Sequence, residues 1–132
     1  MDALIYCRNS KGAARSVEEQ ETEARAECAR NDWTVTEVVT DLVGASRHSR
    51  SKRTGWARAE AIIRSGAVQV LVTWEASRAQ RDLDAYGELR RLCVAAGVKW
   101  SYGGSTYDLS NKDDRFRTGL DALYEAADRD PR

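Results

Sequence analysis

Arginine and serine residues recur where apolar runs of this sequence stop. Arg8 and Ser10 end the first apolar run, and Arg78 and Arg81 follow the strongest one, at 68–74. A guanidinium stays charged at any working pH, and its planar fork matches two oxygens of a phosphate group. A serine hydroxyl ringed by guanidiniums is therefore suited to attack on a phosphodiester, because the arginines stabilise the charge that develops on the phosphoryl group. The alternative is that Arg8 and Ser10 are only the polar start of a loop.

Other catalytic chemistries find little support in the sequence. His48 is the only histidine, and no carboxylate lies close to it in the sequence, which disfavours a Ser-His-Asp triad. Cys7, Cys28 and Cys93 are odd in number and far apart, so neither a zinc-ligand spacing nor a disulfide framework fits them. No glycine-rich nucleotide signature occurs. We therefore expect no metal and no cofactor.

Composition predicts one soluble domain, since the chain has 132 residues, of which 42% are hydrophobic and 32% charged. No apolar run approaches the length of a membrane span and no signal peptide opens the chain, so we expect a cytoplasmic protein without membrane contact. Net charge is zero, which disfavours a uniformly basic nucleic-acid binder. Residues 47–64, however, hold six Arg or Lys against the single acid Glu60. This stretch is either a solvated loop and helix face or a phosphate-facing surface.

Helices and strands are expected to alternate along the chain. Ser16 and Glu19 have the spacing of a capping box and predict a helix from Ser16 to about Arg30. The β-branched run 33–40 predicts a strand that ends at Asp41. The remaining expected elements are a long loop at 42–53, a helix at 55–65, a strand at 68–74, a helix at 82–96, a strand at 98–102 and an antiparallel edge strand at 105–109. The inward residues of the helix at 82–96 are expected to be Leu83, Tyr86, Leu89, Leu92 and Cys93. A final helix should start at Asp113 or Asp114, one of which caps it, and run through Phe116, Leu120 and Leu123 toward Asp130.

This order predicts an α/β fold with a mostly parallel four-stranded sheet, a short antiparallel edge strand and flanking helices. Parallel strands present their carboxyl ends at one edge of the sheet, where ligands bind in such folds. Polar residues from three strands should therefore converge there, and Arg53 at the mouth of the long loop can reach the same place. The set comprises Arg8, Ser10, Asp41, Arg53, Arg78 and Arg81.

Several segments, taken together, resemble a known family. They are YCRNS at 6–10, SVEEQ at 16–20, TD at 40–41, KRTGW at 52–56, VTWEASRAQRD at 72–82 and DLS…DDRF at 108–116. In this order they resemble the catalytic domain of the serine recombinase (resolvase/invertase) family, and most of all its large serine integrase branch. The resemblance covers nearly the whole chain.

The resemblance implies a role for each matching residue. Ser10 would attack a DNA phosphate and form a 5′-phosphoserine link, while Arg8, Arg53, Arg78 and Arg81 hold the phosphate and Gln20 and Asp41 support the site. The implied partner is double-stranded DNA at recombination sites, with dimers that join into a synaptic tetramer in the full-length protein. Neither ATP nor metal is implied. Residues 1–132 would be the N-terminal catalytic domain, without DNA-recognition domains, and thus a fragment or natural remnant of a longer integrase.

The chain departs from the family pattern at three positions. Ser77 stands where the family commonly has Asp, which leaves the general acid open, with Glu75 or Asp82 as nearby substitutes. Thr54 replaces a frequent proline, and Asn9 an apolar residue. One alternative is thus a catalytically impaired module of the same fold that dimerises or associates with DNA. A small-molecule phosphohydrolase is a third interpretation, but it needs a water-activating base or a metal.

Overall fold

The computed structural model describes residues 1–9, 16–42, 54–74 and 83–129. Strands and helices alternate from the N-terminus to β4, as predicted. The elements are β1 (Asp2–Asn9), α1 (Val17–Arg30), β2 (Thr34–Leu42), α2 (Thr54–Ser65), β3 (Val70–Val72), α3 (Leu83–Ala96), β4 (Lys99–Tyr102), β5 (Ser105–Tyr107) and α4 (Lys112–Arg129).

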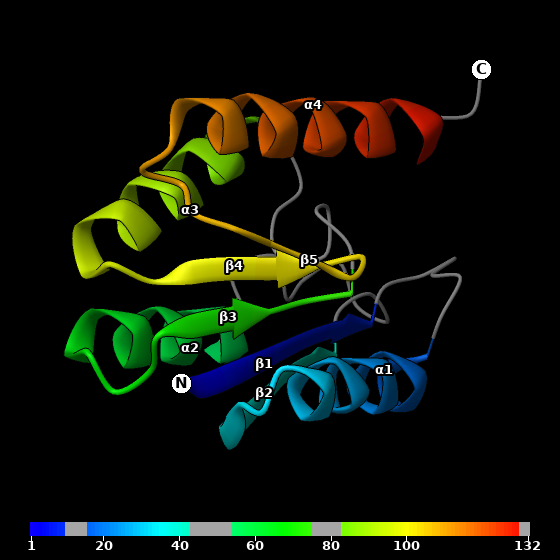
Figure 1. The fold of residues 1–132 in the computed structure, drawn as a ribbon. Helices are drawn as coiled ribbons and strands as arrows, with labels where there is room; N and C mark the ends of the chain where they lie inside the picture. The colour runs from blue at the N-terminus through cyan, green and yellow to red at the C-terminus, as the bar shows by residue number, and fades with distance from the viewer. Residues whose placement is uncertain (10–15, 43–53, 75–82, 130–132) are drawn as a thin grey trace.

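The five strands form one sheet in the order β2-β1-β3-β4-β5. The first four are parallel, and β5 pairs with β4 in the antiparallel direction, so the predicted fold class is confirmed. Helix α1 covers one face of the sheet and α2 and α3 cover the other, while α4 packs on α3 (Figure 1). The carboxyl ends of β1, β2, β3 and β4 consequently meet at one edge.

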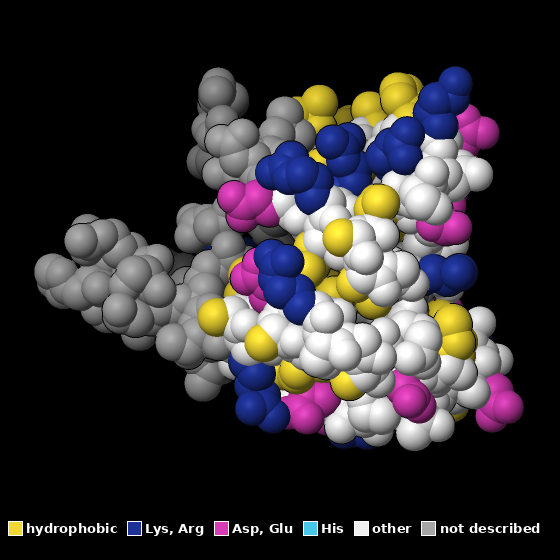
Figure 2. Space-filling view, turned by 90° about the vertical axis from the view of Figure 1, so that its left-hand side faces the viewer, with side chains coloured by type: hydrophobic (Ala, Val, Ile, Leu, Met, Phe, Trp, Pro, Cys, Tyr) yellow, Lys and Arg dark blue, Asp and Glu magenta, His cyan; other side chains and the backbone are white. Residues whose placement is uncertain are grey.

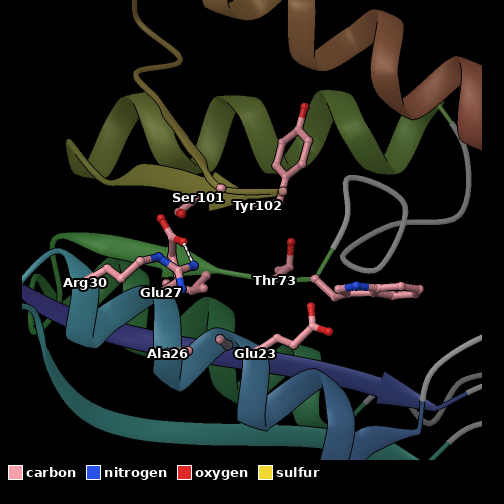
Figure 3. A pocket seen from close by; sticks show the side chains of 12 residues that line it. Glu23, Ala26, Glu27, Arg30, Thr73, Ser101 and Tyr102 are labelled. Atoms are coloured by element: carbon pink, nitrogen blue, oxygen red, sulfur yellow. Dashed lines mark hydrogen bonds and ion pairs between the residues drawn. The ribbon is translucent and has the colours of Figure 1, made fainter.

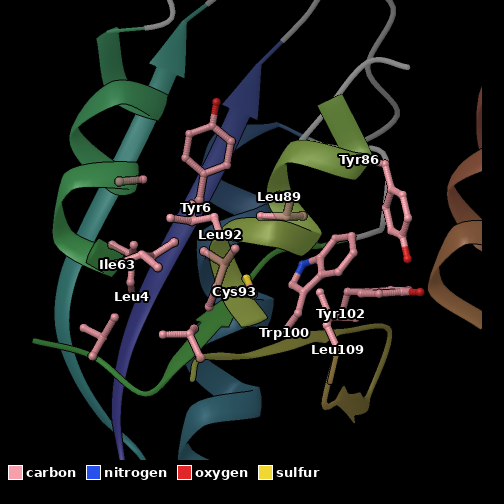
Figure 4. Close-up of a cluster of buried hydrophobic side chains, with 14 of the residues drawn as sticks. Leu4, Tyr6, Ile63, Tyr86, Leu89, Leu92, Cys93, Trp100, Tyr102 and Leu109 are labelled. Atoms are coloured by element: carbon pink, nitrogen blue, oxygen red, sulfur yellow. The ribbon is translucent and has the colours of Figure 1, made fainter. Parts of the chain in front are cut away.

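Strand β1 lies in the middle of the hydrophobic core and is buried on both faces. Leu4 and Tyr6 contact the cluster beneath α2 and α3 (Figure 4), whereas Ala3, Ile5 and Cys7 contact the cluster beneath α1. Alternate side chains of a strand point to opposite faces, so a strand covered on both sides must be apolar throughout. This explains why the first polar residues after the run come at its carboxyl end.

The helix caps agree with the sequence at α1 but not at α4. Ser16 and Glu19 form the predicted capping box, with distances of 3.1 and 3.0 Å for the two reciprocal bonds. At α4 the prediction of Asp113 or Asp114 as the cap is wrong. The Oδ1 atom of Asn111 accepts the N–H of Asp114 at 3.0 Å, and the Asp114 carboxylate instead accepts the N–H of Asp108.

Two strands are shorter than predicted. The ladder of β3 covers only Val70–Val72 rather than 68–74, because its neighbours pair with it only there. Strand β5 ends at Tyr107 rather than at 109, and Leu109 is instead buried in the core. Within the described part of the chain, no helix is both long enough and apolar enough to cross a membrane.

Candidate active site

The structure brings together three of the residues that the sequence placed in the site. Arg8 and Asp41 are direct neighbours in the β1–β2 register, and Gln20 reaches the same strand end from α1. All three are buried, with exposed fractions of 3%, 3% and 1%. The other predicted site residues, Ser10, Arg53, Ser77, Arg78 and Arg81, lie outside the described residues.

Gln20 holds the carboxyl end of β1 through its side-chain amide. Its Nε2 atom donates to the carbonyl oxygen of Arg8 at 2.9 Å, and its Oε1 atom accepts the N–H of Arg8 at 3.2 Å. The amide thereby bonds both backbone groups of one residue, as a neighbouring strand would. Since a buried backbone group without a partner is costly, this pair of bonds fixes where β1 ends relative to α1.

Asp41 joins the ends of β1 and β2 to the first turn of α2. Its carboxylate accepts the hydroxyl of Tyr6 at 2.5 Å and the backbone N–H groups of Gly55 and Trp56 at 2.8 and 2.9 Å. The first N–H groups of a helix have no partner within the helix, and a carboxylate at that end also interacts favourably with the helix dipole. Asp41 therefore acts as a cap for α2 supplied by another element.

Tyr6 and Gly55 are two parts of this arrangement that the sequence analysis did not single out. The Tyr6 ring is fully buried and meets Trp56 edge-on, with centroids 5.1 Å apart. A Cβ atom on Gly55 would lie 2.7 Å from Oδ1 of Asp41 and 2.9 Å from the carbonyl oxygen of Thr40. The position thus requires glycine. The glycine of KRTGW and the tyrosine of YCRNS were the available signals, but neither shows what it contacts.

The described part of the basic stretch 47–64 is neutralised by ion pairs. Arg58 pairs with Glu37 of β2, and Arg64 pairs with Glu60 at 2.9 Å. These two arginines therefore fit a solvated helix face better than a phosphate-facing surface. The rest of the stretch, up to Arg53, lies outside the described residues.

Positive charge without a carboxylate partner is found elsewhere among the described residues. Arg90, Arg91 and Arg115 line a shallow groove of α3 and α4 around Val94, and none of them forms an ion pair with a described acid. Lys and Arg side chains also gather in the upper part of Figure 2, where these two helices lie. This groove is formed by the helix layer and is separate from the strand ends that hold Arg8 and Asp41.

The cysteines are free and buried, as their spacing predicted for a chain without disulfides. Burial raises the pKa of the Cys7 and Cys93 thiols to about 12, because a thiolate loses its hydration there. They are therefore unreactive thiols that pack in the core. Among the described residues, no group of three or more His, Cys, Asp or Glu is placed to hold a metal ion.

A comparison with protein-family models decides the family. Residues 3–131 match the model described as the N-terminal domain of resolvase. The chain belongs to the resolvase family. The resemblance to serine recombinase catalytic domains that the motifs indicated is thus confirmed. Comparison with curated protein sequences gave no match.

Solved structures share the fold of this resolvase domain at low sequence identity. The N-terminal catalytic domain of TP901-1 integrase superposes with a TM-score of 0.72 at 17% identity, over 98% of this chain and 97% of that one. A resolvase family site-specific recombinase from Streptococcus pneumoniae gives 0.73 at 20% identity, over 97% and 89%. The C-terminal catalytic domain of ISC1926 TnpA, an IS607-like serine recombinase, gives 0.67 at 16% identity, over 95% and 99%.

Proposed function

We propose that this resolvase domain, residues 1–132, catalyses site-specific DNA recombination with Ser10 as the nucleophile. The Ser10 oxygen loses its proton and attacks the scissile phosphorus, and the bond from phosphorus to the 3′ oxygen breaks. That oxygen takes up a proton and leaves as a 3′-hydroxyl, while the 5′-phosphate stays on Ser10. After strand exchange, a 3′-hydroxyl attacks the phosphoserine and restores the serine. Because the ester conserves the energy of the phosphodiester, the cycle needs neither ATP nor metal.

The observation that carries this proposal is the fixed strand end at Arg8. Gln20 bonds both backbone groups of Arg8, and Asp41 lies beside it in the sheet register. Ser10 follows Arg8 by two residues, so the backbone just before the nucleophile is held in place. Holding a reacting group in place before the substrate arrives is a major source of catalytic rate.

The supporting residues divide into two roles in this proposal. Arg8, Arg53, Arg78 and Arg81 would hold the phosphate and stabilise its developing charge. Asp41 would act indirectly and not on the phosphate itself, because its two oxygens already accept three hydrogen bonds from Tyr6, Gly55 and Trp56. It fixes the first turn of α2, which begins one residue after Arg53.

The central experiment looks for the covalent intermediate. The protein as its gene encodes it is incubated with fragmented duplex DNA of its host, digested with nuclease and protease, and analysed by mass spectrometry. We expect a nucleotide on the peptide that contains Ser10, and its loss in Ser10→Ala. Ser105→Ala, a matched change at an exposed serine of β5, should leave the adduct unchanged. Adducts that persist in Ser10→Ala would contradict the proposal.

The same experiment tests the alternative, a catalytically impaired module that dimerises or associates with DNA. Ser77 stands where the family commonly has Asp, and Glu75 and Asp82 are the neighbouring carboxylates. If Glu75 or Asp82 protonates the leaving oxygen, Glu75→Gln or Asp82→Asn should slow adduct formation and leave DNA binding unchanged. A wild-type protein that binds DNA but never forms an adduct would favour the impaired module.

We further propose that α4 mediates self-association. One side of the helix packs on the fold, where Thr118 and Ala122 are buried. The other side exposes large apolar side chains, which soluble monomers seldom gather on one surface. They are Phe116, Leu120, Leu123 and Tyr124, with exposed fractions of 72%, 49%, 49% and 76%.

Sedimentation equilibrium tests this surface. The chain should form dimers at micromolar concentration, and Phe116→Ser combined with Leu120→Ser should shift it to monomers. Val94→Ser, at an exposed apolar residue of α3, is the matched control and should not weaken the dimer. A chain that stays monomeric at all concentrations would refute self-association through α4.

A further inference from the structure

A pocket of about 390 Å³ opens on the α1 face of the sheet, opposite to the face that holds Tyr6 and Asp41. Helix α1 forms one wall, and the ends of β3 and β4 with the turn after β4 form the other (Figure 3). This volume lies within the range of small-molecule sites. None of the residues proposed to act in DNA cleavage is among the described residues that line it.

The polar group that marks this pocket is the hydroxyl of Ser101. Ser101 is fully buried and lines the pocket, and its Oγ atom makes no hydrogen bond within the described part of the chain. Its backbone is satisfied, since the carbonyl oxygen accepts the N–H of Thr73 at 3.0 Å. Figure 3 shows the side chain on the side of β4 that faces Glu27 of α1. Buried hydroxyls nearly always have a partner, so this one is available to bond a group that enters the pocket.

The charged residues of the pocket favour a ligand that carries both hydrogen-bond donors and acceptors. Glu27 is 9% exposed, and its carboxylate bonds the guanidinium of Arg30 and the amide of Asn31. Donors and acceptors thus stand side by side on the α1 wall. Glu23 is the third charged residue among the described residues of the lining. Because the Glu27–Arg30 pair places a carboxylate beside a guanidinium, it suits a neutral ligand that carries both donors and acceptors.

The indole of Trp74, which is half-buried, contributes a flat apolar surface to the same pocket. Aromatic side chains of this kind stack on planar rings, and nucleobases are the planar rings that carry hydrogen-bond donors and acceptors along one edge. We propose that this pocket binds a neutral planar heterocycle of the nucleobase class. Its polar edge bonds the Ser101 hydroxyl and the Glu27–Arg30 pair, and its ring lies against Trp74.

Nuclear magnetic resonance of the 132-residue chain tests the proposal, with guanosine, adenosine, cytidine and thymidine as probes. At least one nucleoside should shift the amide signals of Ser101, Gly103 and Gly104 in a saturable way, with a Kd below about 1 mM. For that nucleoside, Ser101→Ala should weaken binding at least fivefold and Ser105→Ala should not.

A stability measurement separates a ligand role of Ser101 from a structural one. Since its hydroxyl bonds nothing in the described part of the fold, Ser101→Ala should melt no lower than the wild type. A given concentration of the nucleoside should raise the Tm of the wild type more than that of the variant. Saturable shifts for none of the four probes, or equal binding by Ser101→Ala, would each overturn the proposal. Ser10→Ala should bind the nucleoside unchanged, so the result does not depend on DNA cleavage.

Discussion

Replacing Gly55 by alanine should destabilise the fold, although alanine is normally the better helix former. The added Cβ atom would lie 2.7 Å from Oδ1 and 2.9 Å from Cγ of Asp41, and 2.9 Å from the carbonyl oxygen of Thr40. The carboxylate cannot simply turn away, because it accepts the hydroxyl of Tyr6 and two N–H groups of α2. The carbonyl belongs to β2 and is fixed by the sheet. Either α2 or the end of β2 must therefore shift.

The size of the effect follows from these contacts. Overpacking a filled site costs about 1–3 kcal/mol, and a hydrogen bond to a charged group is worth about 1.5–3 kcal/mol. The higher helix propensity of alanine offsets up to about 1 kcal/mol of this loss in stability. We therefore expect Gly55→Ala to lower the free energy of unfolding by about 2 kcal/mol and the Tm by roughly 8 °C.

Urea denaturation followed by circular dichroism measures this change. Gly87→Ala in α3 is the matched control, because its Cβ would meet only the flexible guanidinium of Arg91, at 3.4 Å. The free energy of unfolding of that variant should rise by about 0.5–1 kcal/mol, as expected for Gly→Ala within a helix. If Gly55→Ala were as stable as Gly87→Ala, the close approach of α2 to Asp41 would not constrain the fold, and the reasoning would be refuted.

Three further changes follow from the same contacts. Tyr6→Phe should lower the free energy of unfolding by about 2 kcal/mol in urea titrations, because the hydroxyl bonds a carboxylate; Tyr107→Phe, whose hydroxyl has no described partner, should be near neutral. Gln20→Leu should lower the free energy of unfolding by about 2–4 kcal/mol and speed hydrogen exchange at the Arg8 amide, because both backbone groups of Arg8 lose a hydrogen-bond partner. Unchanged exchange at this amide would contradict the prediction. Burial raises the pKa of Cys7 to about 12, so its contribution to stability should be complete below pH 9 and lost between pH 9 and 12, where only the unfolded chain releases the thiol proton. Cys7→Ala should flatten that part of the pH profile.

The elements were predictable because their signals are local. The Ser16–Glu19 capping box needs only one turn of chain, and the apolar run of β1 follows from burial on both faces. The cap of α4 shows where local signals stop being decisive. Asn111 and Asp114 are both good caps by residue type, and the choice is made by a bond from the Asp108 backbone, which occupies the Asp114 carboxylate.

The candidate site was predicted only as a set of residues at one sheet edge. That Arg8 and Asp41 would meet there followed from parallel strands, and the register places them side by side. What each one does depended on partners far away in the sequence. Tyr6 and Asp41 are 35 residues apart, and Asp41 and Gly55 are 14 apart.

The sequence by itself therefore determined the succession of helices and strands, the fold class and the family, because periodicity, caps and short motifs act over a few residues. Only the tertiary structure decided that Asp41 caps α2, that Gln20 bonds the end of β1, and that Ser101 faces a pocket. These contacts arise when the sheet order β2-β1-β3-β4-β5 brings distant segments together. A carboxylate looks the same in the sequence whether it will meet water, a phosphate or the first turn of a helix.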